Sequence, residues 1–417
     1  MGFVRCLRGI ASGAEYSADQ PMNLDPLDGR PVEMVLDLER LAAARPDQSW
    51  YQPQRKDIWR FGGLMALDID HAVDAAYIVA LGEGATPLLD YTCHPVAAKA
   101  GLDLTIKEEG KAHAGFGANP TQSFKDRGMA MVVAQARRLG IERLAAPTQG
   151  NAGDSLVHYA LAAGLSVVVA MPGDTPAPIL GNVAAAAHRH PDRVILELAG
   201  PTIREAGALL REKYIPQGYF SVATFQEPGW RIEGKKSLGL ELAEPAAGST
   251  RWSLPDAIIY PTGGGTGVLG MWKAWQELEA LGLIDGRRPR MICVQSEAMP
   301  PLVRAFDAGL ADTTAQSGEG TLAFGLNVPA GVGHFRVLEI IRASGGAAVA
   351  VAESAIAAEL ARVWRETHWW ISPEGAACLA ALPQLLDRGL LGRGDRVVAV
   401  NTGSAEKYLP ALRHLLD

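Results

Sequence analysis

Short runs of β-branched and apolar residues alternate with alanine-rich stretches through most of this chain. The β-branched and apolar runs predict strands at residues 166–171, 193–198, 257–260, 291–294 and 396–400. The alanine-rich stretches predict helices at 36–44, 131–139 and 156–163. Strands that are apolar on both faces and alternate with helices form parallel sheets that helices cover on both sides. The pattern therefore predicts an α/β fold with mostly parallel sheets.

The length of the chain exceeds what one ordinary hydrophobic core requires. Its 417 residues are 48% hydrophobic and 20% charged, a normal globular balance. We therefore expect two domains that are interleaved in sequence. Residues 1–80 combine polar loops with short amphipathic pieces and are interpreted as an N-terminal adapter segment.

Charge and cysteine content exclude several partner classes. The net charge is −7 and the basic pairs are scattered, so no nucleic-acid partner is expected. No run of about 18 apolar residues predicts a membrane span. Four scattered cysteines and a start without a long apolar core indicate a cytoplasmic protein with reduced thiols and no metal site. The expected partner is a small molecule.

Four loops stand where a strand gives way to a turn, the place where α/β sheets bind ligands. The first covers residues 119–128, in which Ser123 suits a helix N-cap and Lys125 falls in the first helical turn. The helix dipole disfavours a cation there, so the amine is less basic and suited to forming an imine. A solvent-facing surface lysine is the alternative that these residues alone leave open.

Two further loops carry polar groups that could contact a ligand. In residues 147–153, Gly150 and Gly153 flank Asn151, and backbone N–H groups at such a turn bind carboxylate or phenolate oxygen. In residues 401–404, a hydroxyl at a strand end can hydrogen-bond a heteroaromatic nitrogen. The alternatives are an ordinary strand–helix turn for the first, and a helix cap by Thr402 or Ser404 for the second.

The glycine-rich loop at residues 263–267 gives the strongest single signal. Four of its five residues are glycine, and it lies between a predicted strand and a helix through Trp272 and Trp275. Such a loop can wrap its amides around a phosphate at a helix N-terminus. Each glycine adds an entropic cost on folding, so a purely structural loop seldom needs so many. The loop therefore predicts a phosphate site.

A dinucleotide fingerprint is the competing interpretation of that loop. Residues 265–270 fit the pattern GxGxxG, and Glu297 ends the next apparent strand, where a ribose-binding acid is expected. The protein would then be a nicotinamide-dependent oxidoreductase. This interpretation leaves Lys125, Asn151 and Thr402 unexplained, so the phosphate of a different cofactor is favoured.

Taken in order, these segments resemble the threonine synthase family, which belongs to the tryptophan-synthase-β-like, fold type II enzymes that use pyridoxal 5′-phosphate (PLP). The resemblance runs from about residue 80 to the end. It rests on residues 81–88 (LGEGATPL), 119–128 (NPTQSFKDRG), 150–153 (GNAG), 231–236 (RIEGKK), 263–267 (GGGTG) and 401–404 (NTGS). Several motifs in a fixed order are more specific than any one of them.

The resemblance assigns roles to individual residues. It implies that Lys125 holds PLP as a Schiff base, that Phe124 belongs to the cofactor site, and that Asn151 hydrogen-bonds the ring O3′. Thr402 would lie beside the pyridine nitrogen, and Arg231 would bind the phosphate of the substrate. It further implies a phosphate cup of Gly263, Gly264, Gly265, Thr266 and Gly267, and a substrate-carboxylate loop of Thr148, Gln149, Gly150 and Ala152.

The resemblance also implies an architecture and a reaction. PLP would lie in the cleft between a large domain, residues 81–115 and 235–417, and a small substrate-side domain, residues 116–234; a homodimer is one expected assembly. The expected activity is that of a lyase of amino-acid biosynthesis, which converts O-phosphohomoserine and water to threonine and phosphate. The alternative is β-elimination or β-replacement on serine, threonine, O-phosphoserine or a related amino acid.

Three features depart from the family pattern. Gln122 stands where the family usually has glycine before Ser-Phe-Lys. The stretch 224–231 lacks the asparagines that typically precede the arginine, and it adds the acidic Glu227. The N-terminal region retains only Cys6, where many relatives carry paired cysteines that resemble a zinc ribbon. The first two departures bear on the substrate and leave the cofactor prediction intact.

Overall fold

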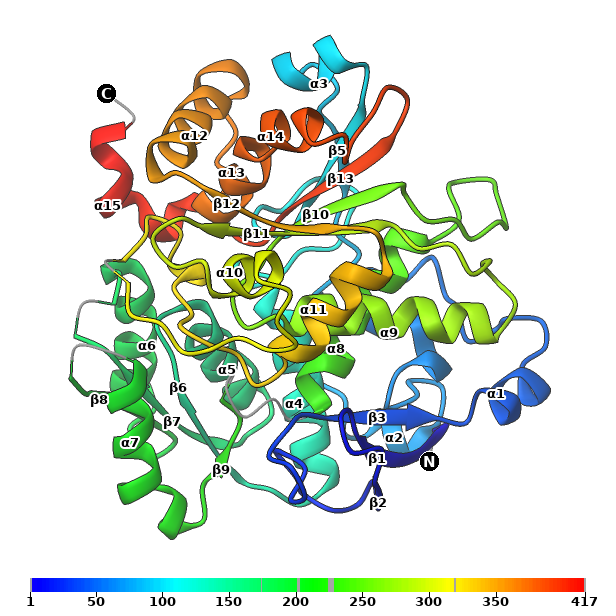
Figure 1. The fold of residues 1–417 in the computed structure, drawn as a ribbon. Helices are drawn as coiled ribbons and strands as arrows, with labels where there is room; N and C mark the ends of the chain where they lie inside the picture. Colours follow the sequence, from blue (N-terminus) through cyan, green and yellow to red (C-terminus); the bar gives the residue numbers. More distant parts are fainter. Residues whose placement is uncertain (1, 174, 201–202, 224–228, 319, 416–417) are drawn as a thin grey trace. The chain divides into compact units, whose positions relative to one another are not determined.

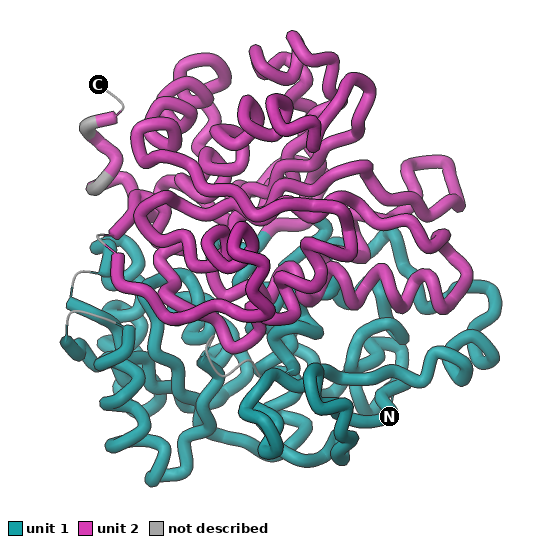
Figure 2. Tube along the Cα trace, viewed as in Figure 1, with its two compact units in different colours: residues 1–85, 119–237 teal, residues 86–118, 238–417 magenta. Residues whose placement is uncertain are grey.

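The computed structural model describes residues 2–415, except residues 174, 201–202, 224–228 and 319 (Figure 1). The chain folds into two compact units (Figure 2). Unit 1 comprises Met1–Ala85 and Asn119–Ser237, and unit 2 comprises Thr86–Ala118 and Leu238–Asp417. The first 85 residues therefore group with residues 119–237, and their role as an adapter stays a prediction.

Unit 1 begins with a small antiparallel sheet of order β2-β1-β3. Its strands are β1 (Val4–Gly9), β2 (Glu15–Tyr16) and β3 (Val32–Leu36). Asp37 ends β3 and starts the next helix, because its side chain accepts a hydrogen bond from the Arg40 N–H at 2.9 Å. The short helices α1 (Leu38–Ala44), η1 (Ile58–Leu64) and α2 (Ala72–Ala75) follow.

A four-stranded parallel sheet forms the second part of unit 1, with order β8-β7-β6-β9. The strands are β6 (Arg143–Pro147), β7 (Ser166–Met171), β8 (Val194–Leu198) and β9 (Phe220–Ser221). The helices are α4 (Lys125–Arg138), α5 (Asn151–Ala162), α6 (Ala177–Arg189), α7 (Ile203–Lys213), η2 (Ile215–Gln217) and α8 (Gly229–Ala243), the last of which ends in unit 2.

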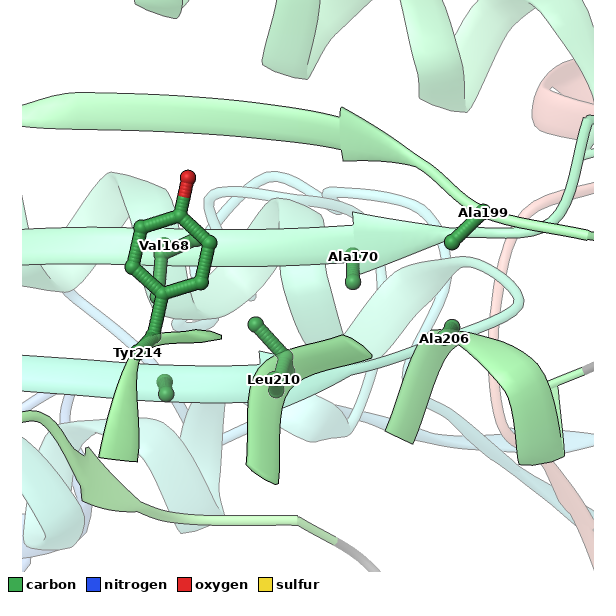
Figure 3. Packing of buried hydrophobic residues seen from close by; sticks show 7 residues of the cluster. Val168, Ala170, Ala199, Ala206, Leu210 and Tyr214 are labelled. Carbon is green, nitrogen blue, oxygen red and sulfur yellow. The ribbon is translucent and has the colours of Figure 1, made fainter. Parts of the chain in front are cut away.

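Small side chains let α7 pack closely on this sheet. Val168 and Ala170 of β7 meet Ala206 and Leu210 of α7, and Tyr214 closes one end of the cluster (Figure 3). All five are almost fully buried. Apolar burial of this kind supplies roughly 25 cal/mol per Å² and holds helix and sheet together.

The sheet of unit 2 has six strands in the order β12-β11-β10-β13-β5-β4. All neighbours are parallel except β4 and β5. The strands are β4 (Leu88–Asp90), β5 (Asp103–Glu108), β10 (Ala257–Pro261), β11 (Arg290–Ser296), β12 (Ala347–Val351) and β13 (Arg396–Asn401). Strands β5, β10, β11 and β13 run in one direction. The loops that follow them therefore meet at the same side of the sheet, beyond the carboxyl ends of the strands.

Helices cover both faces of this sheet (Figure 1). One side carries α12 (Glu353–Thr367), α13 (Pro373–Ala380) and α14 (Leu382–Asp387), and the other carries α9 (Thr266–Ala280), α10 (Pro301–Asp307) and α11 (His334–Ala343). The remaining elements are α3 (Pro95–Ala100), η3 (Phe324–Leu326), η4 (Ala405–Tyr408), α15 (Leu409–Leu412) and η5 (Arg413–Leu415).

The predicted α/β class and the predicted strands are confirmed, and the errors lie at element ends. The helix predicted from residue 36 begins at Leu38, because Leu36 pairs in β3. Helices α4 and α5 begin earlier than their apolar stretches suggest, at Lys125 and Asn151. Among the described residues, no helix has both the length and the apolar composition needed to cross a bilayer.

Candidate functional site

Lys125 is the first residue of α4 in unit 1. Its backbone N–H donates to Ser123 Oγ at 3.3 Å, so the predicted capping hydroxyl is used, although Phe124 holds the cap position. The Lys125 side chain is half-buried, and its Nζ lies 4.3 Å from the centroid of the Phe124 ring. The helix start thus keeps the amine against an aromatic face.

Gln122 adopts a left-handed backbone conformation, with φ of +53°. An L-residue other than glycine costs roughly 1–2 kcal/mol in this region. This gives the physical reason why glycine suits the turn before Ser-Phe-Lys. The chain retains the turn at that cost, with a glutamine side chain beside the lysine loop.

Asp126 clamps the lysine turn to the next helix. Its buried carboxylate accepts hydrogen bonds from the Thr121 N–H at 2.8 Å, from Thr121 Oγ1 at 2.7 Å and from Ser155 Oγ at 2.5 Å. Thr121 precedes α4 and Ser155 lies in the first turns of α5, which begins at Asn151. The clamp therefore fixes the backbone around Lys125 relative to the helix that carries Asn151.

The loop from Thr148 to Ala152 is organised by one hydroxyl. Thr148 Oγ1 accepts hydrogen bonds from the N–H groups of Gly150 at 3.0 Å and Gly153 at 3.3 Å. A substrate carboxylate in this loop must therefore use other donors or displace the threonine. Gln149 is half-buried, and Thr148, Gly150 and Ala152 are buried.

Arg231 lies in the first turn of α8 and is almost fully buried. Its Nη1 donates to the Val222 carbonyl, just after β9, at 3.1 Å. The neighbouring acid Glu233 pairs with Lys236 at 2.5 Å. The atypical residues of the stretch before Arg231, including Glu227, lie outside the described part of the chain. Arg231 is thus an interior guanidinium, the kind of group that can hold a phosphate through two bonds.

The glycine loop of unit 2 joins β10 to α9. Gly265 is the N-cap of α9 with φ of +86° and offers no side-chain cap to the first helical amides. A Cβ at Gly263 would lie 2.3 Å from the Gly325 carbonyl oxygen, and one at Gly267 would lie 1.9 Å from Tyr260 Oη. Bulkier residues are therefore excluded, and the start of α9, with Gly264 and the buried Thr266, suits an anion.

His334 contacts the backbone of that loop. Its Nδ1 accepts from the Gly331 N–H at 3.1 Å, and its Nε2 lies 2.8 Å from the Gly263 carbonyl oxygen, which assigns the proton to Nε2. Burial lowers the pKa of His334, consistent with this neutral form. Sequence reasoning missed this residue, because it lies about 70 positions from the loop it holds.

Thr402 follows β13 and is buried. The preceding Asn401 accepts at Oδ1 from the Ser372 N–H at 2.9 Å and donates from Nδ2 to Glu108 at 2.9 Å. Burial raises the pKa of Glu108 to about 7. Of the two hydroxyls that could cap a helix here, Ser404 takes that role, accepting a hydrogen bond from the Glu406 N–H at 3.2 Å.

Close backbone packing fixes the same strand end. A Cβ at Gly110 would lie 2.3 Å from the Gly403 carbonyl, so the segment after Glu108 and the segment after Asn401 are in direct contact. The Glu108 carboxylate accepts from the Gly110 N–H at 2.6 Å and the Lys111 N–H at 2.9 Å. Neither Glu108 nor Asn401 was predicted as a site residue, since their pairing joins strands 293 positions apart.

A separate open cleft of about 830 Å³ lies at the opposite edge of the unit 2 sheet. Its lining lies at and before the first residues of β10, β11 and β13 and includes Arg251, Asp256, Arg288, Arg290 and Arg396. Ligands of parallel sheets bind at the carboxyl ends of the strands. The cleft is therefore at the wrong edge to hold a ligand of the glycine loop.

The groups in each unit fit a phosphorylated aldehyde cofactor. Unit 1 supplies an amine at a helix start together with Asn151, and unit 2 supplies an uncapped glycine helix start together with the Thr402 hydroxyl. Comparison with family models gives a match over residues 79–403 to "Pyridoxal-phosphate dependent enzyme". This chain belongs to the pyridoxal-phosphate-dependent enzyme family.

The similarity of this PLP enzyme to individual relatives extends over nearly the whole chain. It is 31% identical over 399 residues to the threonine synthase of Methanosarcina acetivorans, covering 95% of this chain and 91% of that protein. It is 29% identical over 406 residues to the threonine synthase of Methanocaldococcus jannaschii, covering 96% and 92%. These relatives confirm the resemblance read from the motifs.

A solved structure shares the fold. The L-serine ammonia-lyase of the fungus Rhizomucor miehei matches with a TM-score of 0.64 and 19% identity, over 80% of this chain and 97% of that one. The predicted PLP cofactor is confirmed by the family, and the dinucleotide interpretation of residues 265–270 is set aside. The individual residue roles stay predictions.

Proposed function

We propose that this PLP-dependent lyase acts as a threonine synthase, converting O-phosphohomoserine and water to threonine and phosphate. The observation that carries the proposal is the buried guanidinium of Arg231. A phosphate ester brings close to two negative charges, and burying them requires cationic donors. Relatives named threonine synthase that match over more than nine-tenths of both chains support the same substrate.

Residues of both units take part in the proposed reaction. Bound PLP supplies an electron sink for the carbanion beside the amino group. Lys125 would hold the cofactor through its amine, and its free amine would move the protons at Cα and Cβ of the substrate. Asn151 would contact the ring oxygen, and the loop 263–267 would bind the cofactor phosphate. A neutral Thr402 hydroxyl beside the ring nitrogen would favour elimination and replacement over transamination.

A second candidate is β-elimination or β-replacement on serine, threonine or a related amino acid. The observation that favours it is Gln122, a polar side chain in a left-handed position beside Lys125 where the family usually has glycine. A changed surface at this turn alters the space available to a leaving group. This candidate keeps the same roles for Lys125 and Thr402 and gives Arg231 a structural one.

Phosphate release tests the proposal directly. The purified protein is supplied with O-phosphohomoserine, O-phosphoserine, serine and threonine, and phosphate, keto acid and amino-acid products are measured. We expect equimolar phosphate and threonine from O-phosphohomoserine. Turnover of serine or threonine to a keto acid, with no phosphate from O-phosphohomoserine, would support the second candidate instead. The expected homodimer and cytoplasmic location belong to this proposal, and light scattering measures the former.

A further inference from the structure

His334 is the first residue of α11 in unit 2, and its side chain is completely buried. Its Nδ1 accepts a hydrogen bond from the Gly331 N–H at 3.1 Å, and Thr313 Oγ1 lies 2.9 Å from the same nitrogen. Because Nδ1 is an acceptor, the proton of the neutral ring is on Nε2, which lies 2.8 Å from the Gly263 carbonyl oxygen. Two neighbours of Nδ1 therefore fix the tautomer that donates to the glycine loop.

The start of α11 also packs against one face of this loop. A Cβ at Gly265 would lie 2.5 Å from Val337 Cγ2, and a Cβ at Gly331 would lie 3.1 Å from the Gly264 carbonyl oxygen. Gly263 and Gly264 are nevertheless partly exposed. The loop therefore has one face in contact with α11 and the residues just before it, and it is accessible from another face.

The hydrogen bond from His334 sets the orientation of the peptide group between Gly263 and Gly264. A trans peptide is planar, and its C=O and N–H bonds point in opposite directions. Since the Gly263 carbonyl points to the imidazole, the Gly264 N–H points away from it. Among the described residues, no acceptor for this N–H is identified. A backbone donor so directed suits an anion, as do the first amides of α9.

We propose that His334 is a positioning residue that directs the Gly264 N–H to the phosphate of PLP. It would act through this one peptide group and not through contact with the cofactor. Without the hydrogen bond the peptide can rotate, because neither glycine has a Cβ that restricts it. A rotated peptide would present a carbonyl oxygen to the phosphate in place of a donor. This inference rests on the proposed role of the loop 263–267 and is independent of the amino-acid substrate.

Three substitutions separate the roles of the two ring nitrogens. His334→Gln keeps a donor near the position of Nε2, His334→Asn keeps an acceptor near the position of Nδ1, and His334→Leu keeps neither. Ile341→Val, a buried truncation at the other end of α11, controls for lost packing. Each holoenzyme is equilibrated with increasing pyridoxal, which lacks the phosphate, and the released PLP is measured. This competition gives the ratio of the two affinities, so that contributions of the shared ring and aldehyde cancel.

We expect the preference for PLP over pyridoxal to fall about tenfold in His334→Leu and His334→Asn, because one charge-assisted hydrogen bond to the phosphate is lost. The phosphorus NMR resonance of bound PLP should move in the same two variants. His334→Gln and Ile341→Val should keep the wild-type preference. Equal weakening of PLP and pyridoxal binding in His334→Leu and His334→Asn would show a purely structural role and overturn the inference. An equal loss of preference in His334→Gln overturns it as well.

A second pair of variants tests the loop itself. Thr266→Asp places a carboxylate at the start of α9, where it suits the helix but would repel a phosphate bound by the loop, and Thr266→Asn is its uncharged counterpart. A lower preference for PLP in Thr266→Asp than in Thr266→Asn, with no change in the His334 variants, overturns only the role of His334. Equal preference in the Thr266 pair overturns the loop as the phosphate site. The phosphate-release assay tests the choice of substrate separately.

Discussion

Glu83 is a fully buried carboxyl that contacts helix α5. It accepts hydrogen bonds from Trp59 Nε1 at 3.0 Å, Tyr159 Oη at 2.8 Å and the Leu81 N–H at 2.8 Å. Tyr159 lies in α5, so one carboxyl joins the N-terminal segment to the helix of Asn151. Burial raises the pKa of Glu83 to about 7.

This raised pKa predicts a pH dependence of stability. The folded state binds the Glu83 proton more tightly than the unfolded state, so stability declines as pH rises from about 4.5 and the loss is complete above about 7. Glu83→Gln removes the ionisation. The unfolding free energy of Glu83→Gln minus that of the wild type should therefore be about 2 kcal/mol larger at pH 8 than at pH 5.5.

Urea unfolding at several pH values measures this difference. The exposed Glu39→Gln serves as the control for loss of a carboxylate, and its difference from the wild type should stay constant with pH. If the Glu83→Gln and wild-type curves run parallel, Glu83 does not titrate in this range.

At the scale of elements, the crossing of α4 and α8 depends on Gly234. Gly234→Ala in α8 would place a methyl group 2.1 Å from the Arg127 carbonyl oxygen of α4, which no side-chain rotation can relieve. We expect a loss of about 1–3 kcal/mol in unfolding free energy from the forced separation of the helices. Gly181→Ala in α6 is the matched control, because its Cβ would meet nothing within 4 Å. It should stabilise by up to about 1 kcal/mol through helix propensity.

The urea midpoints of the two variants check this prediction, and PLP binding provides a second measurement. A separated crossing should also weaken retention of PLP, since Phe124 and Lys125 stand at the start of α4. Equal stability of the two variants would mean that the helices adjust at no cost and that Gly234 is not required for the crossing.

The sequence predicts features that depend on neighbours along the chain. Buried strands such as β7, the lysine at a helix start and the glycine loop before α9 all have local patterns, and the structure has them at the expected places. The contacts of Lys235 with Phe124 and of Glu108 with Asn401 join distant segments. No local periodicity encodes such pairs, because they depend on how helices cross and strands align.

At the scale of the whole molecule, the residues proposed for the cofactor are divided between the two units. Lys125, Asn151 and Arg231 belong to unit 1, and the glycine loop and Thr402 belong to unit 2. Arg231, which we propose to bind the substrate phosphate, therefore lies in the same unit as Lys125, the proposed cofactor lysine. This division predicts that substrate preference can change while the loop that we propose to bind the cofactor phosphate stays intact.

The last prediction tests that separation through Arg231. If Arg231 binds the phosphate of O-phosphohomoserine, Arg231→Ala should lose about 2–4 kcal/mol of transition-state stabilisation for this substrate, as when one partner of a buried charge pair is removed. The ratio of the kcat/KM values of wild type and variant measures this loss. The variant should lose far less for serine, which has no phosphate to bind. Inorganic phosphate should compete with O-phosphohomoserine in the wild type and much less in the variant.

Arg211→Ala, on the exposed surface of α7, controls for the change in net charge and should behave as the wild type. Because Arg231 also donates to the Val222 carbonyl, a purely structural role would reduce turnover of both substrates equally and leave phosphate competition unchanged. That outcome would contradict phosphate binding by Arg231 and favour the β-elimination candidate.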